Sequence, residues 1–147
     1  MKATADELES VLTVTEVLHR IDEAAASARP APGKWSPKEI LGHLIDSAAN
    51  NHQRFVRLQL AKRIDLPGYP QDEWVSLQRY QDHKWSDIVD LWRLYNLHLA
   101  IVIRNLDPSA LSNVWKTPSG EEVNLQFIAS DYLTHMRHHL DQILSRT

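Results

Sequence analysis

The sequence predicts an all-α protein, a four-helix bundle with a short β-hairpin before its last helix. Four long segments carry apolar residues at helical spacing, so each helix would have one apolar face to bury. Stretches that contain proline, glycine and polar residues separate these segments and forbid one continuous helix. Helices that each have one apolar face, joined antiparallel, can bury those faces together as a bundle.

Length and composition limit the kind of protein this can be. The 147 residues are expected to form a single domain, residues 1–147, with a proper core. A formal net charge of −3 and the lack of Lys/Arg runs argue against a nucleic-acid partner. The chain has no cysteine, which excludes disulfides, thiolate metal ligands and a cysteine nucleophile. No segment resembles a signal peptide or a membrane span, so we expect a cytoplasmic protein without membrane association.

The first helix is expected over residues 6–27, where apolar side chains recur at helical spacing before an alanine-rich end. It contains Glu16 and His19, an Glu-x-x-His string of the kind that di-iron bundles use in two copies. Because the chain has no second copy, we interpret these two residues as a surface pair.

The second helix is predicted from Ser36 to about Ile64. Ser36 can cap the free backbone N–H groups, Pro37 suits the first helical position, and Glu39 completes a capping box. These three residues together are a strong indication of a helix start.

On this helix, His43 lies on one flank of the apolar face, in line with Ser47, Asn50 and Arg54 at about 100° per residue. A flanking position fits a residue at the mouth of a cavity. An ordinary histidine at the boundary between core and solvent fits it nearly as well.

Residues 65–83 are expected to be irregular, with a short helical turn between Trp74 and Tyr80. A connection of this length often carries function, but a loop packed on its own Tyr69 and Trp74 is an equally good explanation.

The third helix should begin at a Ser86 cap and end near Leu106, where Asp107 and Pro108 stop it. His98 lies beside the apolar seam of this helix. It could approach the other histidines or be a satisfied boundary residue.

Apolar and β-branched residues flank Pro118-Ser119-Gly120, which predicts a small β-hairpin. The fourth helix then spans about residues 124–145. His135 and His139 lie on one side of its apolar stripe, followed by Gln142, and His138 points further round toward solvent.

His135 and His139 are four residues apart, so their side chains lie one turn apart on the same helix face. Two imidazoles in this arrangement can bind one transition metal, as in helical zinc motifs. The pair alone is a weak indication, and His43 strengthens it because both helices carry their imidazoles at the edge of a core stripe. The alternative in which the three histidines bind nothing stays open.

Two stretches resemble a known family. Residues 35–47, Trp-Ser-Pro-Lys-Glu-Ile-Leu-Gly-His-Leu-Ile-Asp-Ser, resemble the opening of the second helix in the DinB superfamily, particularly its YfiT-like branch. Residues 135–140 resemble the His-x-x-His-His-Leu element of that branch, and the loop and hairpin also lie where the branch has counterparts. Leu140 and Asp141 stand where more typical members have Arg-Gly, which favours the YfiT-like branch.

The resemblance implies a bundle, commonly a homodimer, that holds one divalent metal, nickel or zinc, through three histidines. On this sequence these are His43, His135 and His139, whereas His138 matches a histidine that the family does not usually use as a ligand. YfiT-like members have been called metal-dependent hydrolases. Characterised relatives are thiol S-transferases that use a low-molecular-weight thiol, bacillithiol or mycothiol.

Three imidazoles leave a coordination position open, which is typical of a catalytic metal site. The main hypothesis is a thiol S-transferase that acts on small electrophiles with a thiol from outside the chain. The alternatives are a metal-dependent hydrolase of an amide or ester, and a bundle that binds metal without turnover.

Surrounding residues would discriminate among these functions. A pocket walled by Arg54 and Arg57 would suit an acidic thiol, and a closed, fully coordinated metal would favour the non-catalytic protein. A carboxylate near the metal would favour the hydrolase, with Asp72, Glu73 and Asp131 as candidates by position only. Asp131 could instead orient His135, one turn further along the helix. Periodicity places these residues near the site, with a solvated helix surface as the alternative for each: Ser47, Asn50, Arg54, His98, Asp131 and Gln142.

Overall fold

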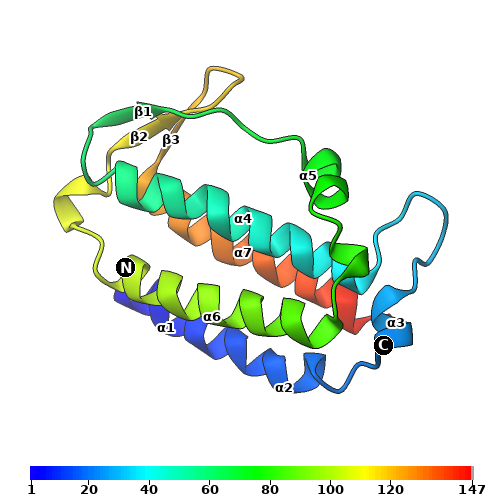
Figure 1. The fold of residues 1–147 in the computed structure, drawn as a ribbon. Coiled ribbons are helices and arrows are strands. Elements are labelled where there is room, and N and C mark those ends of the chain that lie inside the picture. The colour runs from blue at the N-terminus through cyan, green and yellow to red at the C-terminus, as the bar shows by residue number, and fades with distance from the viewer. Residues whose placement is uncertain (147) are drawn as a thin grey trace.

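The computed structural model describes residues 1–146 and shows a bundle of long helices with a small sheet at one end (Figure 1). The helices and strands, in chain order, are α1 (Lys2–Val11), η1 (Leu12–Val14), α2 (Thr15–Leu18), α3 (Glu23–Ser27), α4 (Pro37–Arg57), β1 (Arg63–Asp65), α5 (Gln71–Leu77), η2 (Tyr80–Asp82), α6 (Trp85–Arg104), η3 (Pro108–Ala110), β2 (Val114–Lys116), β3 (Glu122–Asn124) and α7 (Leu125–Leu144). The four-helix bundle and the hairpin before its last helix, β2–β3, are therefore confirmed.

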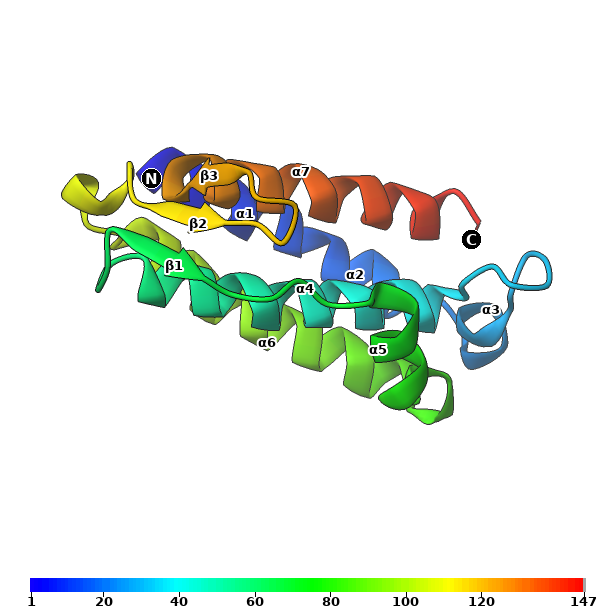
Figure 2. The same cartoon turned by 90° about the horizontal axis from the view of Figure 1, so that it is seen from above.

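The sequence predicted that all four helices are joined antiparallel, and this prediction is wrong. Figures 1 and 2 show that α4 and α6 run in the same direction, opposite to α1 and α7. At about 1.5 Å per residue, the 21 residues of α4 span roughly 30 Å, so the chain must return over that distance before α6 begins. Residues 58–84, including β1 and α5, make this return and pass over α4 (Figure 2).

The first half of α4 is the centre of the core. Every residue from Ser36 to Ala48 is buried, because α6, α7, α3 and α5 all pack against this helix. Gly42 is required by the packing, since a Cβ there would lie 2.2 Å from Cδ2 of Tyr80. The Tyr80 hydroxyl donates to Oδ1 of Asp46 at 2.7 Å and so fixes the ring in that position.

The first predicted helix, residues 6–27, is wrong as a continuous element. The chain passes through η1 and α2 and turns, and α3 then begins at an Asp22 cap that accepts from the backbone N–H of Ala25 at 2.8 Å. β-Branched residues are frequent at the break, and the Thr15 hydroxyl donates to the carbonyl of Leu12. Both features weaken an α-helix.

Two further boundaries differ from the prediction. Helix α4 ends at Arg57, and Ile64 lies in β1, which pairs in parallel with β2 through Ile64 and Trp115. Helix α6 begins at Trp85 with Lys84 at the cap position, so Ser86 is inside the helix. The short helix expected in the loop is α5, which begins at Gln71.

No helix in residues 1–146 is both long and apolar enough to cross a membrane.

Candidate metal centre

Three histidines meet between α4 and α7. His43 comes from the buried half of α4, and His135 and His139 come from successive turns of α7. One ring nitrogen from each residue lies within 4.8 Å of the other two, and the Nε2 atoms of His43 and His135 are 3.2 Å apart. This spacing allows the three imidazoles to bind one ion between them.

Burial keeps these imidazoles neutral. Burial, together with smaller effects of the neighbouring His139 and His135, lowers the pKa of His43 to about 3. It lowers the pKa of His135 to about 4, although the charge of Asp131 acts in the opposite direction. The pKa of His139 is also lowered by burial. A metal ligand must be the neutral imidazole, so this environment suits metal binding at neutral pH.

Gln142 holds His139 in the orientation that a ligand needs. Its Oε1 lies 3.0 Å from Nδ1 of His139 and can accept the ring proton, which leaves Nε2 as the bare nitrogen. The amide nitrogen of Gln142 lies 3.1 Å from Nε2 of His138, which is exposed at the edge of the cluster. Gln142 is thus a partner of the candidate ligands.

The donor set fits a divalent transition metal. Nitrogen ligands of this kind suit zinc and nickel, and among residues 1–146 the site groups three of them without a carboxylate or thiolate. Nδ1 of His43 is buried and has no hydrogen-bond partner within residues 1–146. Within that part of the chain this nitrogen is therefore unsatisfied, which is rare for a buried polar group, whereas Nε2 of the same ring lies 3.2 Å from Nε2 of His135.

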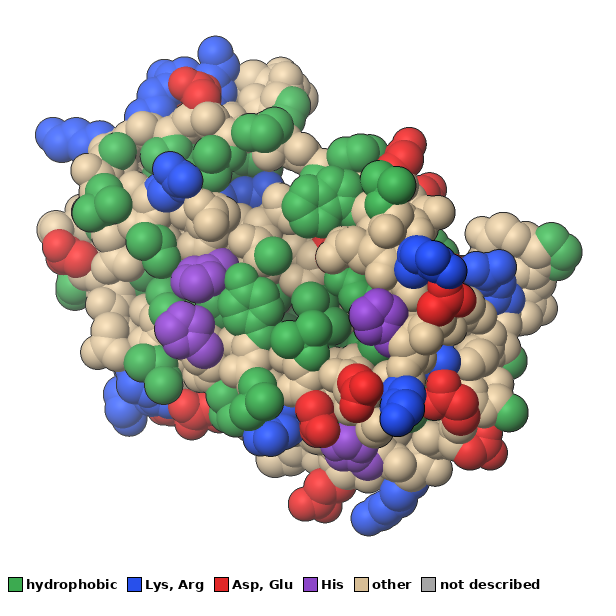
Figure 3. Space-filling view, in the orientation of Figure 1, with side chains coloured by type: hydrophobic (Ala, Val, Ile, Leu, Met, Phe, Trp, Pro, Cys, Tyr) green, Lys and Arg blue, Asp and Glu red, His purple; other side chains and the backbone are tan. Residues whose placement is uncertain are grey.

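The cluster lies beside a cavity of about 360 Å³. Figure 3 shows the surface hollowed below the connection from β1 to α5. The cavity is lined by Ser47, Asn51, Arg54, Gly68, Tyr69, Gln71, Trp115, Val123, Phe127, Ile128, Asp131, Tyr132 and His135. A second hollow of about 300 Å³ is lined by His139, together with Trp35, Asp72 and Gln142. Small molecules can therefore approach the cluster.

Of the residues predicted near the site, Ser47, Arg54 and Asp131 line the cavity beside His135. Asn50 is not among the described residues that line it, and its amide donates to the carbonyl of Asp46 at 2.9 Å. Asn51, one position further along α4, lines the cavity instead.

His98 and Arg57 lie elsewhere. His98 is exposed on α6 and packs against His52, with ring centroids 5.3 Å apart. Arg57 donates to Oε1 of Gln53 at 2.8 Å and lines a separate hollow, so it does not help Arg54 to form a basic wall. Among the candidate general bases, Asp131 lines the larger cavity and Asp72 the smaller one, whereas Glu73 is exposed on α5.

Aromatic residues around the cluster were not predicted as site residues. The Trp35 ring lies 5.0 Å from that of His43, and the Tyr69 ring lies 6.5 Å from it. Tyr69 also packs on Trp74, as the sequence analysis considered, and burial raises its pKa to about 12. The aromatic composition of the loop was the available indication for Tyr69.

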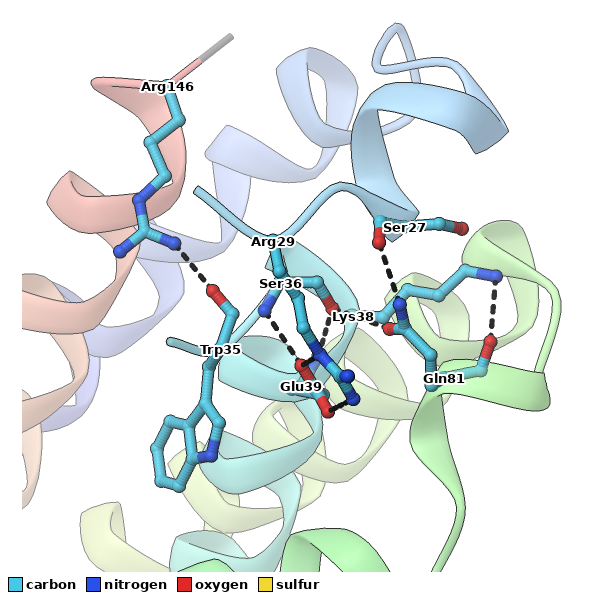
Figure 4. A network of polar contacts seen from close by, with 8 residues as sticks. All are labelled: Ser27, Arg29, Trp35, Ser36, Lys38, Glu39, Gln81 and Arg146. Carbon is cyan, nitrogen blue, oxygen red and sulfur yellow. Dashed lines mark hydrogen bonds and ion pairs between the residues drawn. The ribbon is translucent and has the colours of Figure 1, made fainter. Parts of the chain in front are cut away.

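A polar network around the cap residue Ser36, seven residues before His43, fixes the start of α4 (Figure 4). The predicted capping box is present: Ser36 Oγ accepts from the N–H of Glu39 at 3.2 Å, and Glu39 Oε2 accepts from the N–H of Ser36 at 2.8 Å. Arg29 binds the same carboxylate at 2.9 Å, and Arg146 donates to the carbonyl of Trp35 at 2.7 Å. Distant parts of the chain thus hold the helix that carries His43.

The fold and the histidine cluster are those of the DinB superfamily. The chain belongs to that family, because the sequence model of the family matches residues 10–143. The chain is similar to a Bacillus mycoides protein provisionally named a metal-dependent hydrolase, with 29% identity over 115 residues. That match covers 77% of this chain and 65% of the relative, so the chain spans less than two thirds of that relative. A Bacillus cereus relative with the same provisional name is 25% identical over 134 residues, 90% of this chain and 76% of its own.

Two solved structures share the fold. One is YfiT from Bacillus subtilis, described as a probable metal-dependent hydrolase with an unusual four-helix bundle topology. It matches with a TM-score of 0.88 and 18% identity over 98% of this chain and 83% of its own. A mycothiol-dependent maleylpyruvate isomerase matches with a TM-score of 0.71 and 14% identity over 97% of this chain and 57% of its own. The resemblance to the DinB family and to its YfiT-like fold is thus confirmed.

Proposed function

We propose that this protein is a divalent-metal-dependent enzyme, a thiol S-transferase that acts on small electrophiles. His43, His135 and His139 would hold one nickel or zinc ion. The observation that carries the proposal is the convergence of three neutral imidazoles beside an accessible cavity. A divalent ion held there supplies positive charge that lowers the pKa of a thiol or water beside it.

The chain's own residues would prepare the site for this chemistry. The buried imidazoles remain unprotonated, and Gln142 orients His139. His43 is fully buried with the Trp35 and Tyr69 rings beside it, and water exclusion strengthens electrostatic interactions within a site. The chain has no cysteine, so the thiol must be a separate small molecule.

A likeness to a mycothiol-dependent enzyme supports thiol chemistry on this fold. The alternative, hydrolysis of an amide or ester, is supported by the provisional names of the relatives and by Asp131 at the cavity. A non-catalytic metal-binding bundle is the third possibility. The cavity beside His135 favours an enzyme over that third possibility.

Parallel assays on the zinc- or nickel-loaded protein would separate these functions. We expect the loaded protein to accelerate the reaction of L-cysteine with 1-chloro-2,4-dinitrobenzene, in which an S–C bond forms and chloride leaves. His139→Ala should lose this rate, whereas His138→Ala should keep it. Hydrolysis of 4-nitrophenyl acetate without thiol, and no acceleration with any thiol, would favour the hydrolase instead.

We also propose that the protein is a homodimer. Helix α6 exposes Leu91, Leu94 and Ile101 by 52%, 56% and 58%, and their spacing places them on one face. An exposed apolar face of this kind is typical of protein interfaces. Light scattering should give twice the chain mass of 16.9 kDa, and a single-chain mass at micromolar concentration would contradict the proposal.

A further inference from the structure

Arg54 is a buried cation without a counter-ion. Arg54 is only 9% exposed. It belongs to the end of α4 that lies below the sheet (Figure 1). Within residues 1–146 no carboxylate lies within ion-pair distance of its guanidinium. Burial accordingly lowers the pKa of Arg54. A buried charge is normally paired, because removing it from water is unfavourable.

Among residues 1–146, the contacts of Arg54 leave most of its hydrogen-bond donors free. Nη1 donates to Oδ1 of Asn51 at 3.0 Å, and the guanidinium carbon lies 3.7 Å from the centroid of the Trp115 ring. Stacking on Trp115 fixes the plane of the guanidinium while using only its face. A guanidinium has five N–H groups in a fork that matches a carboxylate.

Arg54 and His135 line the same cavity. His43 and Arg54 are eleven residues apart on α4, which corresponds to about 16 Å along the helix axis. Trp115, Val123 and Phe127 contribute apolar surface to the lining of this cavity. The separation along α4 and the apolar lining therefore suit an elongated molecule with an apolar middle.

The geometry points to Arg54 as the anchor for a carboxylate at the far end of the small-molecule ligand whose other end reaches the three histidines. This inference rests on the proposed function and adds to it the class of ligand: an elongated small-molecule thiol that carries a carboxylate at its far end. Arg54 acts as a binding residue that determines specificity.

The charge distribution fixes the direction in which the ligand binds. Asp131 lines the cavity one helical turn from His135, and its negative charge acts on that imidazole. A ligand carboxylate would be repelled at the Asp131 end and attracted at the Arg54 end. The reactive group is thus left at the histidines.

Calorimetric titration of the zinc-loaded protein with matched probes tests this inference. The probes are ω-mercaptoalkanoates of increasing chain length, the ω-mercaptoalkanols of equal length, and the corresponding alkanoates without a thiol. We expect the mercapto acid to bind roughly tenfold or more tightly than the mercapto alcohol, because a hydrogen-bonded charge pair is involved. The advantage should be largest at one intermediate length that spans from the histidines to Arg54.

Substitutions assign the advantage to Arg54. Arg54→Met keeps an apolar stem and should abolish the preference for the acid, because it weakens binding of the acid far more than binding of the alcohol. Arg54→Lys should retain part of the preference, because it keeps the charge but loses the planar fork. Arg57→Met, the matched control on the same helix, should leave the preference intact, and far-ultraviolet circular dichroism should show that each variant folds.

The two ideas fail in different ways. Equal binding of acid and alcohol by the unsubstituted protein at every length would overturn the role of Arg54 without any variant, as would an acid preference that survives in Arg54→Met. Equal binding of mercapto acid and thiol-free alkanoate would instead contradict thiol binding at the metal, and thus the proposed function. In that case an acid preference lost only in Arg54→Met would still support the carboxylate anchor.

Discussion

Two groups of histidines lie on this bundle, and they differ in ways that matter for chemistry. His52 and His98 lie on the outer face of α4 and α6, and His43, His135 and His139 lie between α4 and α7. Ring centroids are 5.3 Å apart in the outer pair and 4.6–5.1 Å apart in the inner cluster. Proximity of imidazoles therefore does not distinguish the two groups.

The surroundings of the two groups do distinguish them. The inner cluster offers three nitrogen donors, with His43 fully buried and Gln142 orienting His139. The outer pair offers two residues, and Nδ1 of His52 is 3.1 Å from the Tyr95 hydroxyl. A metal site needs several converging donors and partners that orient them, and only the inner cluster has both among residues 1–146.

The largest expected difference is the response of stability to metal. Zinc at about 1,000 times its dissociation constant should raise the free energy of unfolding by about 4 kcal/mol, because it binds only the folded site. His135→Ala should remove most of this gain, and His52→Ala should keep it. Urea unfolding with and without zinc measures the effect, and an equal gain in both variants would contradict the assignment of the inner cluster.

The second difference concerns acid sensitivity of the metal-free protein. The pKa of His43 is about 3 when folded and about 6.5 when unfolded, so below pH 6.5 the unfolded chain binds more protons and stability falls as pH falls. Between pH 7 and pH 4 this costs about 3 kcal/mol for His43. His43→Gln should therefore lose less stability over that interval than the unsubstituted protein. Identical pH dependence in urea unfolding would show that His43 is not held neutral by burial.

The third prediction perturbs the packing behind the inner cluster. Gly42→Ala would force the Tyr80 ring, which hydrogen-bonds to Asp46, away from α4, and should destabilise the protein by about 2 kcal/mol. Gly68→Ala is the control, because its added Cβ would make an ordinary 3.4 Å contact with Pro118. Thermal unfolding of both variants checks this, and equal midpoints would mean that Tyr80 can move freely.

The smallest expected effect comes from removing Gln142, the residue that orients His139. Gln142→Leu should weaken zinc binding by roughly tenfold without abolishing it, since partners of metal ligands contribute on that order. Competition with a chromophoric chelator measures the change. An unchanged affinity would mean that the Gln142–His139 contact does not hold the ring.

Features set by neighbouring residues could be predicted from the sequence. The capping box of Ser36 and Glu39 and the facing pair His135 and His139 depend on one helical turn each. His43 was predicted as the third ligand from its position on a flank of the apolar face of its helix and from the family resemblance. Its meeting with the other two histidines depends on how α4 packs on α7, which periodicity alone does not give.

Features set by distant segments could not be predicted. Strand β1 exists because Ile64 pairs with Trp115, about fifty residues away, and the parallel course of α4 and α6 depends on the whole intervening connection. Asn50 was predicted near the site, whereas Asn51 lines the cavity. The two positions differ by one step of about 100° around the helix, and a helical wheel cannot tell which of them faces the cavity unless the neighbouring elements are known.

The metal content of the purified protein distinguishes the inner cluster from the outer histidines. Elemental mass spectrometry of the purified protein should find about one nickel or zinc ion per chain, the same in His98→Ala, and none in His139→Ala. Metal absent from all three proteins even after incubation with zinc or nickel, or lost in His98→Ala but kept in His139→Ala, would contradict the inner cluster as the metal centre.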